Sequence, residues 1–441
     1  TTVDANVITF ERIKDELYLG RSLERASQEG HHLAWRTIFD SQFTTFIAAF
    51  ILYVFGSGSV KGFATMLLVT IMVTILLNVV FTRFLLTMLI KSGRFDDKPE
   101  YFNVKKEQIP DLSKGEEQKY FGRFDHIDFV KSAKPFILMS IAIISAGLLS
   151  SVIQMGIGNG PLNLGIDFAS GTKITINSDT TLSESELISD FEALGIDNFS
   201  IQLSGDTVAY MTTRETIERT QLDEINTVFL EKYGQEVNDS VVSPVIGFEL
   251  AQNAVFLSIL AWVLIMIFIT VRFEFDYALG TIVALLHDVL IVLAVFSIFR
   301  LEVNTELIAV LLAIIGYSVD DSIVIFDRIR ENVNSFGSNH ISKAQYRAII
   351  NDSLRATVMR SLYNTFTTLI PVIFLLGLGS SSIFVFNVAM LVGLVAGAYS
   401  SIFIAAQLWY YIRINAKPKV KKVKVKKNNE PEELTVLGIN D

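Results

Sequence analysis

Long apolar segments are the feature of this sequence that most constrains its fold. The hydrocarbon core of a bilayer is about 30 Å thick, so an α-helix needs about 20 apolar residues to cross it. Eight such runs occur, each with few charges: Phe43–Val60, Gly62–Leu89, Pro135–Met155, Ala254–Val271, Tyr277–Phe299, Thr305–Phe326, Ser361–Leu378 and Ile383–Ile412. Together with 51% hydrophobic and 19% charged residues, they predict a polytopic α-helical membrane protein and exclude a soluble one.

Composition also excludes several kinds of chemistry. The chain has no cysteine and five histidines, so disulfides, thiolate catalysis and Cys-ligated metals are ruled out, and we expect no metal site. A net charge of -9 argues against binding to nucleic acid, so no nucleic-acid partner is expected. The chain starts at Thr1, and Val3–Phe10 resembles the end of a cut helix, so we expect a fragment with about nine spans.

Basic residues in the loops predict the orientation, because Lys and Arg stay on the cytoplasmic side of a membrane. The basic stretches all fall on one side of the runs: Arg12–Arg36, Arg83–Lys134, Arg272, Arg328–Arg360 and Lys417–Lys427. Gly156–Glu249, with 16 acidic and four basic residues, is therefore expected outside the cell membrane. The lysine-rich C-terminal tail is expected in the cytoplasm as a solvated segment that fixes the topology; contact with anionic lipid head groups or ribosomal RNA is the alternative.

The external segment has the pattern of a small soluble domain. Its predicted elements alternate as β-α-β-β-α-β: Thr172–Asn177, Leu182–Leu194, Phe199–Leu203, Thr207–Thr212, Thr220–Tyr233 and Ser240–Ile246. This order predicts an α+β ferredoxin-like sandwich, and Ser183 with Glu186 has the spacing of a capping box. It contains no recognisable nucleophile–base pair or phosphate loop, which favours a docking role over a catalytic one.

The sequence contains an internal repeat. Val3–Lys14 aligns without gaps to Val319–Arg330, and the related triplets Phe43–Thr45 and Phe366–Thr368 follow downstream. Two repeated helix groups are a recurring transporter architecture, with the working site between the repeats near the middle of the membrane.

Carboxylates inside this repeat are the strongest functional indication. Asp320 and Asp321 lie near the middle of their run, and Asp4 is at the equivalent depth in the other copy. Inserting an ionised Asp at the centre of a membrane helix costs about 2.5 to 3.5 kcal/mol. Such an Asp must therefore be protonated, be paired with a cation, or lie in a water-filled channel. Neighbouring carboxylates also push each other's proton affinities apart. We interpret the three as a proton relay; helix-to-helix hydrogen bonding is the alternative.

Three further residues are candidates for the same relay. Arg360 could pair with a carboxylate through its rigid fork of donors, or it could simply mark the membrane edge. His287 and Asp288 are near mid-depth and form a possible secondary relay, with structural hydrogen bonding as the alternative. Other repeat charges, including Arg12, Asp327 and Arg328, are expected to be helix-end charges.

Several motifs resemble the SecD/SecF protein-export family in its fused form. Leu164–Thr172 is similar to the Gly-Ile-Asp-Phe-x-Gly-Gly-Thr motif that opens the external domain of SecF. Ala284–Asp288 and Gly316–Asp321 resemble SecF helix motifs, while Val3–Ile13 and Gly56–Ala64 resemble SecD. The resemblance covers essentially the whole chain and places it in the resistance-nodulation-division superfamily.

The resemblance implies an accessory subunit of the Sec translocase, not an enzyme, in which the proton motive force helps move exported chains. Its partners would be the Sec channel subunits, preproteins and membrane lipid, with protons as coupling ion and no cofactor. Asp4, Asp321 and Arg360 take the positions of the family's functional residues. Family members commonly have Asn at the position of Asp320, so which Asp of the pair titrates stays open. The alternatives are a small-molecule or lipid efflux transporter and a passive translocase scaffold.

We therefore expect a division of the chain into six parts. These are the SecD-like helices 1–92, a cytoplasmic linker 93–134, a first SecF-like span 135–155, the extracytoplasmic domain 156–250, a five-helix bundle 251–412 and a cytoplasmic tail 413–441.

Overall fold

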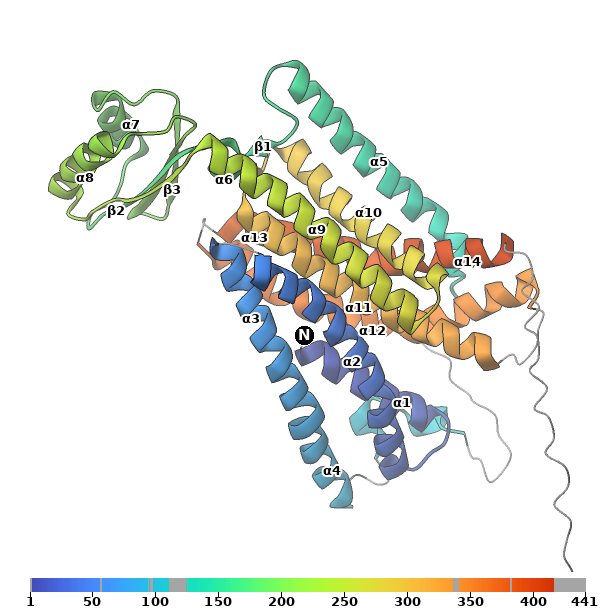
Figure 1. The fold of residues 1–441 in the computed structure, drawn as a ribbon. Helices are drawn as coiled ribbons and strands as arrows, with labels where there is room; N and C mark the ends of the chain where they lie inside the picture. The colour runs from blue at the N-terminus through green and yellow to red at the C-terminus, as the bar shows by residue number, and fades with distance from the viewer. Residues whose placement is uncertain are drawn as a thin grey trace, which may run out of the picture.

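Membrane-length helices dominate the structure. The computed structural model describes residues 2–55, 58–93, 95, 98–110, 124, 126–335, 341–380 and 383–415. Within these residues, eight helical segments are long and apolar enough to cross a membrane: Leu23–Phe55, Lys61–Lys91, Phe129–Gly156, Val245–Arg272, Phe275–Phe299, Thr305–Ser335, Lys343–Leu378 and Phe384–Asn415. The predicted polytopic helical architecture is confirmed, and Figure 1 shows these helices packed as a bundle.

The bundle is built from helices of both halves of the chain. They are α1 (Thr2–Tyr18), α2 (Leu23–Phe55), α3 (Gly58–Ile75), α4 (Arg83–Lys91), α5 (Phe129–Gly156), α9 (Pro244–Arg272), α10 (Phe275–Phe299), α11 (Thr305–Ser335), α12 (Lys343–Leu378), α13 (Phe384–Ser400) and α14 (Ala406–Asn415). A π-helical turn, Leu76–Thr82, joins α3 to α4, and a second one, Ser401–Ala405, joins α13 to α14. Each of these pairs therefore forms one continuous span.

Some predicted span ends are wrong. The run Phe43–Val60 was expected to be one helix, but α2 ends at Phe55 and α3 begins at Gly58. The sequence across this break, Gly56-Ser57-Gly58-Ser59, is a turn signal that the average hydropathy of the longer run does not register. At their other ends, α2 and α12 extend far beyond the apolar runs, because polar residues continue the helices outside the hydrocarbon region.

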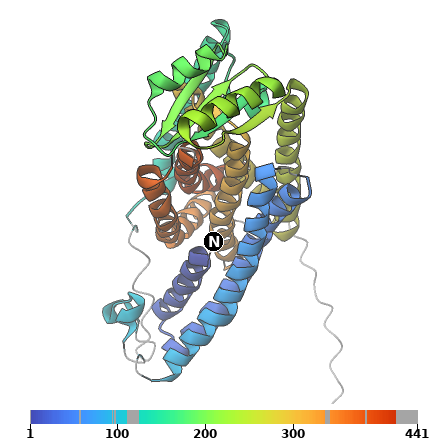
Figure 2. The same cartoon turned by 90° about the vertical axis from the view of Figure 1, so that its left-hand side faces the viewer.

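A four-stranded domain separates α5 from α9. Its elements are α6 (Ile166–Ala169), β2 (Gly171–Asn177), α7 (Glu184–Ala193), β3 (Phe199–Ser204), β4 (Val208–Thr213), α8 (Arg219–Tyr233) and β5 (Asn238–Val242). The strands pair antiparallel in the order β3-β4-β2-β5. This is the arrangement of the predicted ferredoxin-like sandwich, and Figure 2 shows the domain at one end of the bundle.

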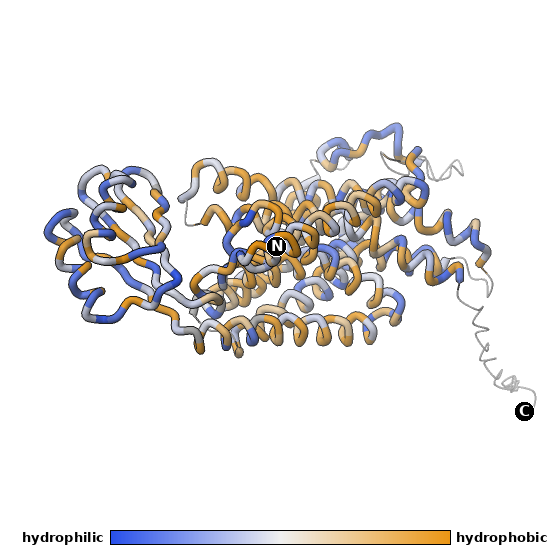
Figure 3. The backbone as a smooth tube through the Cα atoms, turned by 90° about the horizontal axis from the view of Figure 1, so that it is seen from above, coloured by the Kyte–Doolittle hydropathy of each residue, from blue (hydrophilic) through white to orange (hydrophobic). Residues whose placement is uncertain are grey.

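The core of this domain follows the alternation of its strands. Ile174 and Ile176 of β2 point to the same face and are fully buried with Phe191 of α7 and Phe229 of α8. Helices therefore cover one face of the sheet. Figure 3 shows the contrast between this largely hydrophilic domain and the apolar bundle.

Two local predictions for the domain are wrong. The last strand was expected at Ser240–Ile246, but β5 ends at Val242. Ser243 caps α9 by accepting a hydrogen bond from the Ile246 N–H at 3.5 Å, and Pro244 occupies the first helical turn. Proline there favours helix initiation. The capping box at α7 is also absent among the described hydrogen bonds, since Ser183 bonds Ser185 at 2.9 Å instead.

A short parallel pairing ties the start of the domain to the bundle. β1 (Asn163–Leu164) pairs with β6 (Glu302–Val303), which lies between α10 and α11. Two-residue strands carry no recognisable sequence pattern, so this connection was not predicted.

The two repeats pack reciprocally. α1 contacts α2 and α12, and α11 contacts α12 and α2, so the first helix of each repeat touches the second helix of both. The predicted arrangement of repeated helix groups is thereby confirmed, and the repeats meet where α1 packs on α12 and α2 packs on α11.

Candidate functional site: buried carboxylates on α11

The two aspartates of the repeat lie inside the protein. α11 is the most buried of the candidate spans. On it, the residues Asp320 and Asp321 are only 6% and 7% exposed. They therefore do not face lipid. Helices from both repeats surround α11, because it packs against α2, α12 and α13.

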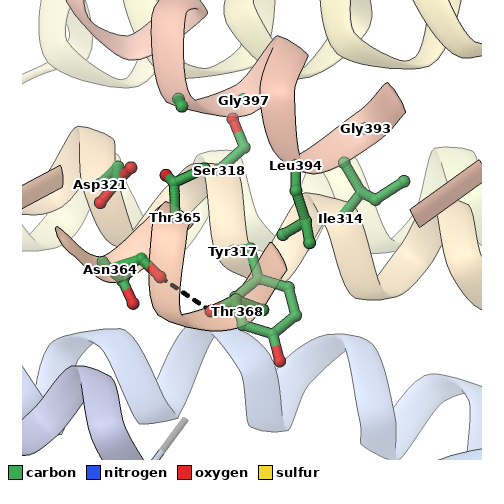
Figure 4. Close-up of a pocket in the computed structure, with 11 residues that line it drawn as sticks. Ile314, Tyr317, Ser318, Asp321, Asn364, Thr365, Thr368, Gly393, Leu394 and Gly397 are labelled. Carbon is green, nitrogen blue, oxygen red and sulfur yellow. Dashed lines mark hydrogen bonds between the residues drawn. The ribbon is translucent and has the colours of Figure 1, made fainter. Parts of the chain in front are cut away.

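A small polar pocket adjoins Asp321. Its lining comes from α11, α12 and α13: Ile314, Tyr317, Ser318, Asp321, Asn364, Thr365, Thr368, Gly393, Leu394, Gly397 and Ala398. Figure 4 shows Asp321, Ser318, Asn364 and Thr365 gathered there. Within the described part of the chain, the buried Oδ1 of Asn364 accepts no hydrogen bond. A pocket with several oxygen atoms and one unused acceptor is suited to hold water.

A second buried carboxylate lies on α10. Asp288 is 1% exposed, and its Oδ1 is 2.9 Å from Nδ1 of His287. Its other oxygen, Oδ2, accepts hydrogen bonds from the hydroxyls of Ser318 at 2.6 Å and Ser400 at 3.0 Å. Asp288 therefore has partners on α10, α11 and α13.

The other ring nitrogen of His287 extends this network. Nε2 lies 2.9 Å from the hydroxyl oxygens of both Ser140 on α5 and Tyr399 on α13, and these two hydroxyls are 3.0 Å apart. Every group in the network can exchange a proton or a hydrogen bond with its neighbour. Hydrogen bonds therefore connect α5, α10, α11 and α13 through this network.

Ser318 connects the two acidic regions. Its hydroxyl donates to Asp288, and the same residue lines the pocket that contains Asp321. Ser318 and Asp321 are three positions apart on α11, so they lie on the same face of the helix. Ser318 therefore connects the pocket at Asp321 to Asp288.

Glycines on α13 make this approach possible. A Cβ atom added to Gly393 would lie 2.0 Å from Cδ1 of Ile314, and one added to Gly397 would lie 3.3 Å from Cβ of Ser318. Small residues four positions apart allow membrane helices to pack closely. The π-helical turn at Ser401 follows directly after Ser400, and such turns are frequent at functional sites.

Two of the predicted residues are placed less completely. Arg360 is on α12, one helical turn before Asn364, and therefore on the side of α12 that faces the pocket. Its pairing with a carboxylate stays a prediction. Asp4 lies in α1, but its side chain is outside the described residues, and the prediction for it is untested. The predicted tail 413–441 also falls mostly outside the described residues.

The expected helix-end charges join the two repeats instead of lying singly at the surface. Arg12 of α1 lies 3.3 Å from Asp327 and 3.6 Å from Glu331 on α11, while Arg328 of α11 lies 3.7 Å from Asp15 on α1. Arg12 aligns with Arg328 in the repeat, and Asp15 aligns with Glu331. The ion pairs therefore repeat the internal symmetry of the sequence.

Sequence reasoning missed the neutral members of the site. These residues are Ser140, Ser318, Asn364, Tyr399 and Ser400. Ser318 lies within the Gly316–Asp321 motif, but nothing in the sequence shows which polar residues its helix would meet. The Gly393 and Gly397 spacing was a usable sign of close helix packing. Among the residues that the structure describes, no three His, Asp or Glu side chains converge as a metal site requires.

Comparison with known families finds two matches. The family described as protein export membrane protein SecD/SecF, C-terminal, matches residues 2–92 and 224–415, which include both copies of the repeat. The SecD/SecF GG motif matches residues 156–181, where β1, α6 and β2 lie.

Individual relatives agree with these matches. The chain is 41% identical over 410 residues to protein translocase subunit SecDF of Bacillus subtilis, covering 92% of this chain and 54% of the relative. It is 36% identical over 282 residues to protein translocase subunit SecF of Sebaldella termitidis, covering 62% of this chain and 90% of that one. The chain thus spans about half the length of the SecDF relatives that it matches.

A solved structure shows the same fold. The crystal structure of SecDF, a translocon-associated membrane protein from Thermus thermophilus, superposes with a TM-score of 0.74 at 30% identity. The match covers 92% of this chain and 52% of that one. The chain belongs to the SecD/SecF family of protein-export membrane proteins.

Proposed function

We propose that this protein is an accessory subunit of the Sec translocase that uses the proton motive force to assist export of unfolded preproteins. It is anchored in the cell membrane, with the four-stranded domain outside the cell and the lysine-rich tail in the cytoplasm. The SecDF and SecF relatives, all named as translocase subunits, support the place in protein export. The buried carboxylates support the coupling to protons.

The observation that carries the proposal is the link through Ser318 between two buried acidic regions. Asp321 lines a polar pocket with Ser318, and Ser318 donates to the fully buried Asp288. A carboxyl group can take up or release a proton, and in its protonated form it also donates a hydrogen bond. Adding or removing that proton changes the hydrogen bonding between α10, α11 and α13. In this proposal, Asp4, Asp320, Asp321 and Arg360 form the primary relay and His287 with Asp288 extends it.

Export into inverted membrane vesicles tests the proposal. Vesicles that contain the protein and the Sec channel would be given an imposed proton gradient, and the amount of protected preprotein would be measured with wild-type protein and with Asp321→Asn. This substitution keeps the shape of the side chain and removes its ability to ionise. We expect stimulation by the gradient to be lost in the variant. Unchanged stimulation both in Asp321→Asn and in Asp320→Asn/Asp321→Asn would support a passive scaffold in its place.

The same vesicles separate export from small-molecule efflux. The pocket at Asp321 has room for roughly one water molecule, which fits a proton path better than a binding site for a drug or lipid. The efflux alternative requires gradient-driven transport of a small apolar dye in the absence of preprotein. We expect no such transport.

A further inference from the structure

Asp167 of α6 binds the beginning of α11. Its Oδ2 accepts two hydrogen bonds from Thr305, one from the backbone N–H at 2.9 Å and one from the side-chain hydroxyl at 2.8 Å. Thr305 is the first residue of α11. A carboxylate at this place is favoured, because the N-terminal end of a helix carries unpaired N–H groups and a partial positive charge.

The segment around Asp167 is fixed to the bundle on more than one side. Next to it, the Gly165 N–H donates to the Val303 carbonyl at 2.9 Å. Phe168 packs against the apolar cluster that includes Val303 and residues of α11. On α9, a Cβ atom added to Gly247 would lie 3.2 Å from the Phe168 carbonyl oxygen. α6 is therefore held tightly between α9 and the start of α11.

The external sheet continues directly from this segment. Only Ser170 separates α6 from β2, and β2 is an inner strand of the sheet that pairs with both β4 and β5. If Asp167 is displaced, β2 must therefore move with it.

The same helix carries the buried carboxylates at its centre. Asp321 is 16 residues after Thr305 along the unbroken α11, a distance of about 24 Å at 1.5 Å per residue. A packed helix of this length moves as a rigid element. A shift or rotation of α11 caused by proton binding at its centre would reach Thr305 unchanged.

We propose that Asp167 is the positioning residue that couples movement of α11 to movement of the external domain. This inference rests on the function proposed above. Proton binding or release on α11 displaces the helix, the two Thr305 hydrogen bonds transmit the displacement to α6, and β2 carries it into the sheet. Loss of these bonds weakens the transmission from α11 to the domain, while the carboxylates still titrate and the packing of Phe168 and the β1–β6 pairing remain.

Other charged groups near Asp167 must be separated from this effect. Three charged side chains interact electrostatically with one another: Lys173 of β2, Glu302 of β6 and Glu306 of α11. Both glutamates also interact with Asp167. Burial raises the pKa of Glu302, while the nearby Lys173 opposes the shift. Acidification could therefore act on the domain directly through Glu302, and the test needs a variant that distinguishes this route.

Distances between paired spin labels in the reconstituted protein test the inference. The chain has no cysteine, so introduced cysteines are labelled uniquely. A domain pair at Glu231→Cys and Leu378→Cys reports the position of the external domain against the end of α12. A bundle pair at Glu24→Cys and Ala348→Cys reports movement between the repeats. All four positions are exposed.

We expect both pairs to change distance on acidification in the parent protein. In Asp167→Ala, the bundle pair should respond as before and the response of the domain pair should be clearly reduced. Asp167→Asn, which keeps an acceptor oxygen, should restore much of it. Ser243→Ala is the matched control, because it removes a helix cap from α9, the other attachment of the domain; its domain pair should respond normally.

The outcomes separate the two proposals. A domain pair that responds fully in Asp167→Ala overturns the coupling role alone. A domain pair that still responds in an Asp320→Asn/Asp321→Asn variant also overturns it, because the signal would then come from Glu302. If neither pair responds in the parent protein, the proton-driven function itself is contradicted, and the coupling role is contradicted with it.

Discussion

The hydroxyl of Ser318 donates a 2.6 Å hydrogen bond to Oδ2 of Asp288. This bond joins the centre of α11 to the centre of α10, and it is the direct contact between the pocket at Asp321 and the His287 network. The proton path proposed here depends on it.

Removing this donor should slow proton-driven export. Ser318→Ala removes the hydrogen bond that links α11 to Asp288, so we expect gradient-stimulated export to fall several-fold. Ser322→Ala is the control, since Ser322 is equally buried on α11 and its hydroxyl has no hydrogen-bond partner among the described residues. Equal effects of the two substitutions would exclude a specific role for Ser318.

The ion pairs between the repeats should stabilise their contact in proportion to their geometry. A double-mutant cycle of Arg12→Ala and Asp327→Ala, whose charges are 3.3 Å apart, should give a coupling energy of about 1 kcal/mol. The 3.7 Å pair of Arg328 and Asp15 should give less. Chemical unfolding of the purified protein in detergent measures both cycles. A larger value for the longer pair would contradict this ranking.

Ser170 is strained, and its replacement by glycine should stabilise the external domain. Its backbone has φ 65° and ψ 161°, a combination that is almost restricted to glycine and costs about 1 to 3 kcal/mol in other residues. The family motif has glycine there. We expect Ser170→Gly to increase the free energy of opening of β2 by about 1 kcal/mol, measured by native-state hydrogen exchange. Faster exchange in the variant would refute the strain.

The contact of Asp128 with Arg347 and Asn351 at the start of α5 should be sensitive to acid. Burial alone would raise the pKa of Asp128, but hydrogen bonds from Arg347, the Lys131 N–H and Asn351 outweigh it and lower the pKa below its ordinary 3.8. The contact therefore contributes its full stability above that value and loses it as the pH falls through the lower pKa of the folded state.

Hydrogen exchange of the Phe129 amide, which donates to Asn351 at 2.9 Å, measures this transition. We expect its protection to fall only at strongly acidic pH. Asp128→Asn should remove the pH dependence. Loss of protection near neutral pH in the wild-type protein would mean that the pKa is raised instead.

Much of the fold could be predicted from the sequence because its determinants are local. Apolar runs located the spans, and alternating apolar residues such as Ile174 and Ile176 located the strands. The gapless repeat around Asp320 found the helix that carries the site. The apolar runs and the alternating residues are local signals, whereas the repeat is found by comparing Val3–Lys14 with Val319–Arg330.

The connections between helices could not be predicted in the same way. Asp167 and Thr305 are 138 positions apart, and the contact between Ser318 and Asp288 depends on which helices become neighbours. A serine in an apolar helix has several possible partners, so its role is decided by tertiary packing. The sequence therefore identified the carboxylates but not the hydroxyls that join them.

The central claim is that the α11 carboxylates bind and release protons, and infrared difference spectroscopy tests it most directly. Acidification of the reconstituted protein should produce the band of a buried protonated carboxyl group. We predict that the band loses much of its intensity in Asp320→Asn/Asp321→Asn and keeps it in Asp276→Asn, whose carboxylate pairs with Arg413 at 2.6 Å. A band of unchanged intensity in the Asp320→Asn/Asp321→Asn protein would contradict the account.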